Sequence, residues 1–178
     1  MRKVVVYELL SLDGVAEQPE VFITDFDEVM DDDLGRVIGS QDAVLLGRRT
    51  YDHWADFWPG SPIEPFASFI NAVDKFVFTS TTPAREWASS TIVDGDLAAF
   101  VGDLKRQAGG DIGVHGSISL AQALLEADLV DELHLVVAPV VHVHGRKLFD
   151  GSTPRRFDLT RSVTSPTGSL LLDYRVRR

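Results

Sequence analysis

The hydrophobic positions of this chain follow two alternating patterns. Short apolar runs, such as Val4-Val5-Val6 and Ala43–Leu46, have the length and composition of strands buried on both faces. Between these runs lie segments in which apolar residues recur every third or fourth position, as on one face of a helix. Strands that alternate with helices predict an α/β fold with a mostly parallel sheet.

The pattern predicts strands at Lys3–Leu10, Ala43–Leu46, Lys75–Thr79, Thr91–Val93, Asp111–Val114 and Glu132–Val141. It predicts helices at Asp25–Ile38 (capped by Thr24 or Asp25), Arg48–Phe57, Leu97–Gln107 and Ile118–Glu126, with an irregular loop at Trp58–Pro62. Near the C-terminus, Phe157–Val163, a Pro166-Thr167-Gly168 turn and Leu170–Val176 predict an antiparallel hairpin. The expected architecture is a three-layer α/β sandwich with a mostly parallel central sheet and an antiparallel C-terminal hairpin.

The chain has 178 residues with no internal repeat, low-complexity segment or long linker, which predicts a single domain over residues 1–178. Its 17 basic and 27 acidic residues give a net charge of -10, which argues against a nucleic acid or an anionic membrane as partner. No apolar run approaches the roughly 20 residues that span a bilayer, and the first residues lack a signal-peptide pattern. Cysteine is absent, which excludes thiol catalysis and disulfides, and a cytoplasmic location is the simplest expectation.

One turn between a strand and a helix has phosphate-binding character. In Gly47-Arg48-Arg49-Thr50, Gly47 ends a buried strand and lets the backbone approach a ligand closely. The helix start offers unpaired N–H groups, the Thr50 hydroxyl and two guanidinium groups, whose forked donors suit a phosphate. A plain helix start with solvated arginines would have the same sequence, so this turn alone does not decide.

Two further turns share that character. His115-Gly116-Ser117-Ile118-Ser119 follows another strand, and its serines either cap the next helix or bind an anion. Thr79-Ser80-Thr81-Thr82 places four hydroxyl groups after a third strand. The carboxyl ends of parallel strands share one edge of a sheet, where α/β proteins bind ligands, so the three turns together indicate a nucleotide site. No Rossmann or P-loop glycine motif occurs, which disfavours a Rossmann dehydrogenase and a P-loop hydrolase.

A series of motifs covers nearly the whole chain in a fixed order: Ser11-Leu12-Asp13-Gly14, Leu45–Tyr51, Phe76–Ser80, Asp111–Ser117, Leu129–Leu133, Ala138–Val141 and Gly145–Phe149. In this series the chain resembles the dihydrofolate-reductase-like superfamily, and most closely the reductase domain of riboflavin biosynthesis and its bacterial relatives. The resemblance implies NADPH as hydride donor, a small-molecule substrate and a homodimer.

The resemblance also implies roles for individual residues. Arg48 and Arg49 would face the adenosine 2′-phosphate or the pyrophosphate, Thr50 would face the pyrophosphate, and Gly47 would belong to the same cofactor-binding turn. Thr79 and Ser80 would lie near the adenosine. The pyrophosphate would be cradled by Gly116, Ser117, Ile118, Ser119 and Leu120, and the nicotinamide bordered by Ser11, Asp13 and Gly14. The chain departs from its relatives at His115, which replaces a glycine and would bring a bulkier side chain to the cofactor, and at His142-Val143-His144-Gly145, which replaces a small glycine-rich turn.

Reduction of a C=N or C=O bond also needs a proton, from a carboxylic acid or from water. On the helix Asp25–Ile38, Asp27 and Asp33 fall within the apolar stripe and Asp31 lies at its edge. Burial there would raise the pKa of a carboxyl group, as a proton donor requires. Asp31 also resembles the substrate-binding acid of dihydrofolate reductases. The alternative is a solvated acidic helix face.

Two other groups of residues, the histidines after the last parallel strand and a cluster of aromatic residues, say less about function. His142 and His144 share a face only in an extended segment and lack an evident third ligand, so no metal site is predicted. The aromatic residues Trp54, Phe57, Trp58 and Phe66 are interpreted mainly as core, although a pterin or pyrimidine ring would stack well on them.

The favoured hypothesis is an NADPH-dependent reductase that transfers a hydride to a small heterocyclic substrate, pterin-like or ribosylamino-pyrimidine-like. In such an enzyme the protein positions the cofactor and the cofactor supplies the chemistry. The alternative is a catalytically degenerate nucleotide-binding or dimeric interaction protein of the same fold, marked by His115 and the histidine loop.

Overall fold

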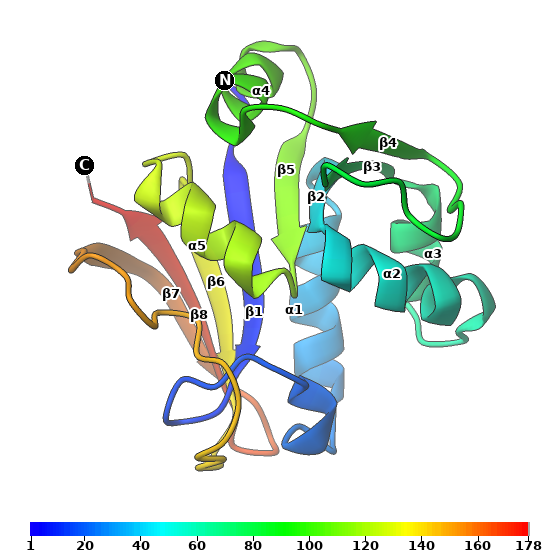
Figure 1. Ribbon diagram of the computed structural model, residues 1–178. Coiled ribbons are helices and arrows are strands. Elements are labelled where there is room, and N and C mark those ends of the chain that lie inside the picture. Colours follow the sequence, from blue (N-terminus) through cyan, green and yellow to red (C-terminus); the bar gives the residue numbers. More distant parts are fainter. Residues whose placement is uncertain (178) are drawn as a thin grey trace.

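The structure, a computed structural model, describes residues 1–177. Its centre is one eight-stranded sheet in the order β4-β3-β2-β5-β1-β6-β8-β7 (Figure 1). Neighbouring strands are parallel across β4 (Ser90–Val93), β3 (Asp74–Phe78), β2 (Gln41–Gly47), β5 (Asp111–His115), β1 (Val4–Leu10) and β6 (Glu132–Val137). β8 (Leu170–Val176) is antiparallel to β6 and to β7 (Phe157–Thr164), which confirms the predicted sheet with its C-terminal hairpin.

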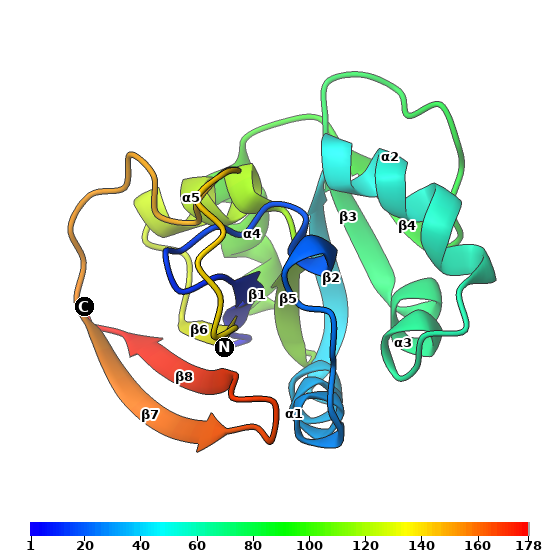
Figure 2. The ribbon, with the colours of Figure 1, turned by 90° about the horizontal axis from the view of Figure 1, so that it is seen from below.

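Helices cover both faces of this sheet (Figure 2). α4 (Leu97–Arg106) and α5 (Ile118–Glu126) lie on one face, and α1 (Glu28–Ile38) and α3 (Phe66–Ala72) on the other. α2 (Arg48–Phe57) contributes its buried residues to the α1 and α3 side. Along β1, alternate side chains enter the two clusters: Val4, Val6 and Leu10 in one, Val5 and Tyr7 in the other. The apolar first strand is therefore buried on both faces, as predicted.

Apart from shifts of one or two residues at the ends of several elements, the structure differs from the prediction at three places. α1 begins at Glu28 because Asp27, rather than Thr24 or Asp25, caps it: the Asp27 carboxylate accepts the N–H groups of Val29 and Met30, both at 3.1 Å. β6 ends at Val137 and not Val141, since Pro139 has no N–H to donate to a neighbouring strand. The segment after α2 contains two helical elements that were not predicted, the 3-10 turn Trp58–Gly60 and the helix α3.

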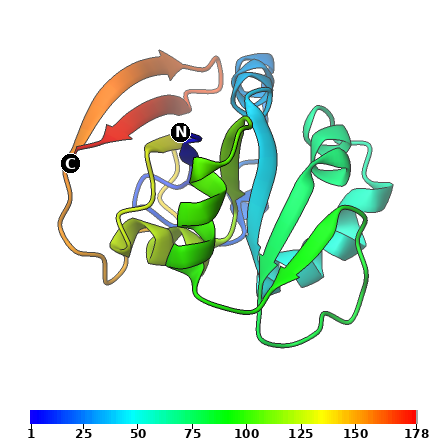
Figure 3. The same cartoon turned by 90° about the horizontal axis from the view of Figure 1, so that it is seen from above.

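The C-terminal hairpin lies beside α1 (Figure 3), and two aspartates of the helix tie them together. Asp27 accepts hydrogen bonds from the Thr167 backbone N–H (3.1 Å) and hydroxyl (2.8 Å) in the β7–β8 turn. Asp33, which is buried, accepts from Arg36 (2.9 Å) and from Arg161 of β7 (2.5 Å). No helix within residues 1–177 is long and apolar enough to cross a membrane.

Candidate functional site

The carboxyl ends of the parallel strands lie at one edge of the sheet, which faces the viewer in Figure 2. The turns after β2 and β5 are hydrogen-bonded to each other. The Gly47 backbone N–H donates to Ser117 Oγ at 3.0 Å, and the Thr50 hydroxyl donates to the Gly116 carbonyl at 3.3 Å. The N-termini of α2 and α5 therefore meet at this edge.

The turn after β3 joins the same group. The Arg48 guanidinium donates to the Thr81 carbonyl (3.1 Å) and hydroxyl (2.6 Å), while its Nε binds Asp52 at 2.7 Å. Thr79 Oγ1 is hydrogen-bonded to the Thr81 backbone, accepting its N–H at 3.1 Å, and Ser80 is exposed. The three turns singled out in the sequence thus form one continuous surface.

The electrostatics of this surface favour an anion. Neither α2 nor α5 has a side-chain cap or an acidic residue in its first turn, whereas α1 and α4 are capped by Asp27 and Asp96. Helix N-termini carry a partial positive charge, so anions stabilise them and cations do not. Arginines nevertheless gather here.

Three arginines lie at these two helix ends. Arg48 and Arg49 are in the first turn of α2, and Arg146, from the loop after β6, donates to Ser119 Oγ at 2.7 Å in the first turn of α5. Within residues 1–177, Arg49 and Arg146 form no salt bridge with a carboxylate. A cation without an acidic partner beside a positive helix end indicates a place for phosphate. No role for Arg146 was predicted from the sequence.

The turn after β1 is occupied by its own hydrogen bonds. The buried Ser11 hydroxyl donates to Asp13 (2.8 Å) and accepts the Val15 N–H (3.0 Å). Asp13 accepts the backbone N–H groups of His142 (2.9 Å) and Val143 (3.0 Å), and these bonds lower the pKa of Asp13 to about 2. Ser11 and Asp13 thus hold the turn against the loop 142–145.

Two side chains that were not predicted to be near Gly116, those of Trp54 and Glu8, lie beside it. Its φ is +64°, and a Cβ here would lie 3.1 Å from Trp54. Glu8 of β1 is 2% exposed, and its Oε1 has no hydrogen-bond partner within residues 1–177. Burial raises the pKa of Glu8 to about 8, although a hydrogen bond from the Gly116 backbone acts in the opposite direction. An acid inside an otherwise apolar strand was the available sequence signal.

The side chain of His115 is buried and does not extend to the edge of the sheet where the three turns lie, contrary to the expectation that it would approach a cofactor there. Its ring is 3% exposed, lies on the α1 and α3 side of the sheet, contacts Phe66 at 5.3 Å between ring centroids, and is 2.8 Å from Gln41 Oε1. Alternation along β5 places it on the same face as Gly113, whose missing side chain leaves room for the pair. Burial lowers the pKa of His115 to about 3, so the ring is neutral.

The remaining predicted residues of the α5 turn divide into two kinds. The side chains of Ile118 and Leu120 are buried, so only their backbone N–H groups can meet a ligand. Gly116 and Ser119 are exposed at the surface.

The two candidate acids of α1 differ. Burial opposes ionisation of Asp27, but hydrogen bonds from Thr167 and Met30 outweigh it and lower the pKa. That carboxylate is saturated by capping bonds, so the raised pKa expected for a proton donor is not found there. Asp31 is half-buried, and burial together with the neighbouring acids Asp32, Asp27 and Glu28 raises the pKa of Asp31.

The aromatic cluster is partly core. Phe66 is buried and packs edge-on against Trp58 at 4.8 Å and Trp54 at 5.5 Å between ring centroids, whereas Phe57 is 47% exposed. The His142 ring packs against Phe22. Among residues 1–177, no group of three or more His, Asp or Glu side chains is arranged to hold a metal ion.

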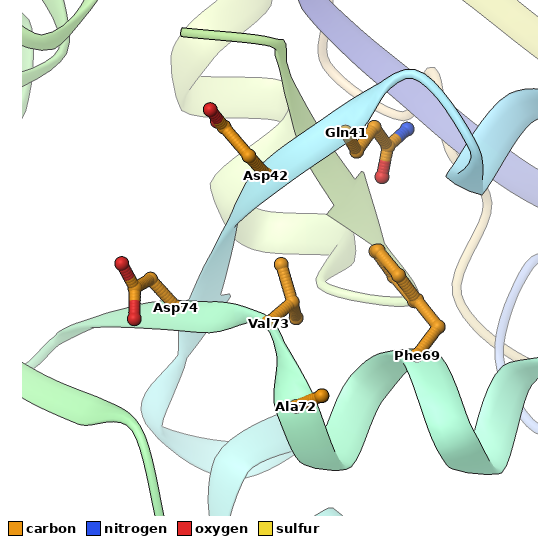
Figure 4. A pocket seen from close by; sticks show the side chains of 6 residues that line it. All are labelled: Gln41, Asp42, Phe69, Ala72, Val73 and Asp74. Carbon is orange, nitrogen blue, oxygen red and sulfur yellow. The ribbon is translucent and has the colours of Figure 1, made fainter.

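A surface hollow of about 370 Å³ lies elsewhere (Figure 4). Gln41, Asp42 and Asp74 at the starts of β2 and β3 line it together with Phe69, Ala72 and Val73. These are the amino ends of parallel strands, at the opposite edge of the sheet from the three turns. The hollow is therefore separate from the candidate site.

Comparison with known proteins defines first the class of fold. The structure superposes on dihydrofolate reductase from Enterococcus faecalis, solved with NADP(H), with a TM-score of 0.65 at 12% identity, covering 99% of this chain and 97% of the other. It superposes on a putative riboflavin biosynthesis protein from Shewanella sp. PV-4 with a TM-score of 0.80 at 18% identity, covering 99% of both chains. The fold is dihydrofolate-reductase-like, as predicted.

The sequence then defines the family. Residues 2–171 match the RibD C-terminal domain, and the chain belongs to that family. It is 30% identical over 153 residues to the uncharacterised protein YwjB of Bacillus subtilis (strain 168), which covers 83% of each chain. The family resemblance stated from the sequence motifs is confirmed.

Proposed function

We propose that this protein is an NADPH-dependent reductase that transfers a hydride to a small heterocyclic substrate, pterin-like or ribosylamino-pyrimidine-like. The observation that carries the proposal is the meeting of the α2 and α5 N-termini, hydrogen-bonded through Gly47 and Ser117 and surrounded by Arg48, Arg49 and Arg146. Membership in the RibD C-terminal domain family and the likeness to a dihydrofolate reductase solved with NADP(H) support the same cofactor.

The residues present fit the phosphates of a dinucleotide. The first N–H groups of α5 and the Ser119 hydroxyl would bind the pyrophosphate, and the Thr50 hydroxyl would bind it by turning its proton away from the Gly116 carbonyl. Arg49, which is exposed and has no acidic partner within residues 1–177, would bind the 2′-phosphate. Arg48 is oriented by Asp52 and Thr81 and would lie between them and the ligand. Bound NADPH would supply the hydride.

For the proton we propose Asp31 rather than Asp27. A proton donor needs a pKa raised toward the working pH, and Asp31 has that direction while Asp27 does not. Asp31→Asn should therefore lower kcat with little change in NADPH affinity. An unchanged kcat would assign the proton to water.

Calorimetric titration with NADPH and NADH tests the cofactor. In the Arg48→Ala/Arg49→Ala double variant, the Kd for NADPH should rise at least about tenfold while that for NADH changes little, because only NADPH carries the extra phosphate. The matched control, Arg106→Ala/Arg156→Ala, removes the same charge away from these turns and should leave both Kd values unchanged. Absence of binding of either dinucleotide would overturn the proposal.

A second function is favoured by one observation. His115 and the aromatic rings around it fill the α1 and α3 face of the sheet next to Gly116, which leaves less room for a substrate ring. A nucleotide-binding protein without a substrate would bind NADPH but would not oxidise it with any pterin, pyrimidine or quinone offered. Steady NADPH oxidation with one of these compounds would instead establish the reductase.

A further inference from the structure

Glu8 is the one acidic side chain of β1, and it forms no salt bridge within the part of the chain that the structure describes. It points to the α5 face of the sheet, where its neighbours on β1 are Val6 and Leu10, and its partner on β6 is Leu135. The carboxyl group is 2% exposed and Oε1 has no hydrogen-bond partner within residues 1–177. β1 pairs with β5 as far as Tyr7 and His115, so the next residue of β1, Glu8, lies beside Gly116 of the candidate phosphate-binding turn.

A buried carboxylate in this position would cost much free energy, because nothing replaces its hydration. The apolar strand neighbours offer no donor, the first two turns of α5 contain no charged side chain, and the guanidinium of Arg146 is bound to Ser119. His115 of β5 is neutral and packs against Phe66 on the opposite face of the sheet. The carboxyl group is thus stable when protonated, and only burial and the Gly116 backbone shift its pKa, which lies at about 8.

We propose that Glu8 is a neutral carboxylic acid that supports the Gly116 turn from beneath, and that a phosphate-bearing ligand binds at this turn only while Glu8 keeps its proton. A negative charge directly under the turn would repel the phosphates and counteract the positive ends of α2 and α5. Binding of the ligand therefore holds the proton on Glu8, and above pH 8 the protein takes up a proton as it binds. Glu8 acts here as a positioning residue.

This inference takes the identity of the ligand, NADPH, from the proposed function. The role of Glu8 would be the same for any ligand that brings a phosphate to the Gly116 turn. NADPH affinity should be constant up to about pH 7.5 and should then weaken about tenfold by pH 9, since each pH unit above the pKa removes most of the protonated form. Calorimetry at pH 8.5 in two buffers of different ionisation enthalpy should show net proton uptake.

Glu8→Gln is the matched variant, because an amide has the shape of the protonated acid and cannot ionise. It should bind NADPH as tightly as the unaltered protein at pH 7, lose the weakening up to pH 9, and show no proton uptake. Glu8→Leu keeps the volume without an acceptor for the Gly116 N–H, and should bind NADPH more weakly at every pH. Lys75, whose pKa burial lowers to about 8, titrates in the same range but is present in all variants, so the difference between profiles isolates Glu8.

The outcomes separate the two proposals. If the unaltered protein binds no NADPH at pH 7, the proposed function fails. If it binds NADPH but the Glu8→Gln profile weakens as much as that of the unaltered protein, or if no proton is taken up at pH 8.5, the Glu8 inference fails and the proposed function stands. Should Glu8→Gln not fold by circular dichroism, the absence of proton uptake by the unaltered protein at pH 8.5 would still overturn the Glu8 inference.

Discussion

Single residues in β5 show how closely this sheet is packed beside the candidate site. A Cβ on Gly113 would lie 2.0 Å from Gln41 Oε1 and 2.8 Å from His115 Nε2. A side chain at position 113 would occupy the space in which Gln41 and His115 meet, so only glycine fits there. The pair in turn fixes the strand that leads into Gly116.

We predict that Gly113→Ala lowers the free energy of unfolding by about 1–3 kcal/mol, because overpacking forces the two side chains off their positions. Urea denaturation would measure the loss, and Gln41→Ala in the same chain should recover part of it by removing the nearer obstacle. Gly60→Ala is the control: no atom lies within 4 Å of its Cβ, so the change should stay within about 0.5 kcal/mol. Equal effects of the two glycine substitutions would contradict the packing argument.

At the scale of elements, α1 depends on Asp27 for its start and for its attachment to the hairpin. We predict that Asp27→Ala costs about 1–2 kcal/mol of stability, since it removes a helix cap and two hydrogen bonds to Thr167. Asp25→Ala, at an exposed residue just before the helix, should cost little. Because Asp27 has a structural role, kcat should be unchanged in the folded variant. A large loss of kcat with normal stability would show instead that Asp27 is a catalytic acid.

The sequence predicted most elements because their signals are local. The start of α2 follows from Gly47 at the end of β2, and the start of α5 follows from the Gly116-Ser117 turn after β5. The predicted bounds of both helices were correct. The start of α1 was not, since Thr24, Asp25 and Asp27 can all cap a helix. In the structure the carboxylate of Asp27 is also held by Thr167, 140 residues away. α3, with seven residues, is too short to show a period.

The candidate site, like the elements, could be predicted only in part. The three turns could be predicted, because parallel strands bring their carboxyl ends to one edge. Arg146 could not, since only the path of the loop after β6 brings it to Ser119. Glu8 was not predicted either, although an acid in an apolar strand was the available signal, because its position beside Gly116 depends on the pairing of β1 with β5.

For the whole molecule, the net charge of -10 makes pH a strong influence on stability. As the pH falls toward the sequence pI of about 4.8, repulsion among the acids declines, which favours the folded state. Individual carboxylates with favourable partners act in the opposite direction. Glu132, at the start of β6, is such a group, with His134 at 3.3 Å and Lys3 at 3.1 Å.

We predict that Glu132→Gln weakens the acid sensitivity of the fold. The His134 hydrogen bond, followed by Lys3, lowers the pKa of Glu132 to about 2 despite burial. A carboxylate with a lowered pKa stabilises the folded state above its unfolded value of about 4.3, and this contribution is lost as the pH falls toward 2. Between pH 5.5 and pH 2.5, Tm should therefore fall by about 2–5 °C more in the unaltered protein than in the variant. Overall repulsion is nearly the same in both chains, so it cancels from the comparison.

Glu20→Gln, at an exposed residue without a hydrogen bond in the described structure, should leave the profile unchanged. Parallel Tm profiles for all three proteins would show that Glu132 adds nothing to stability.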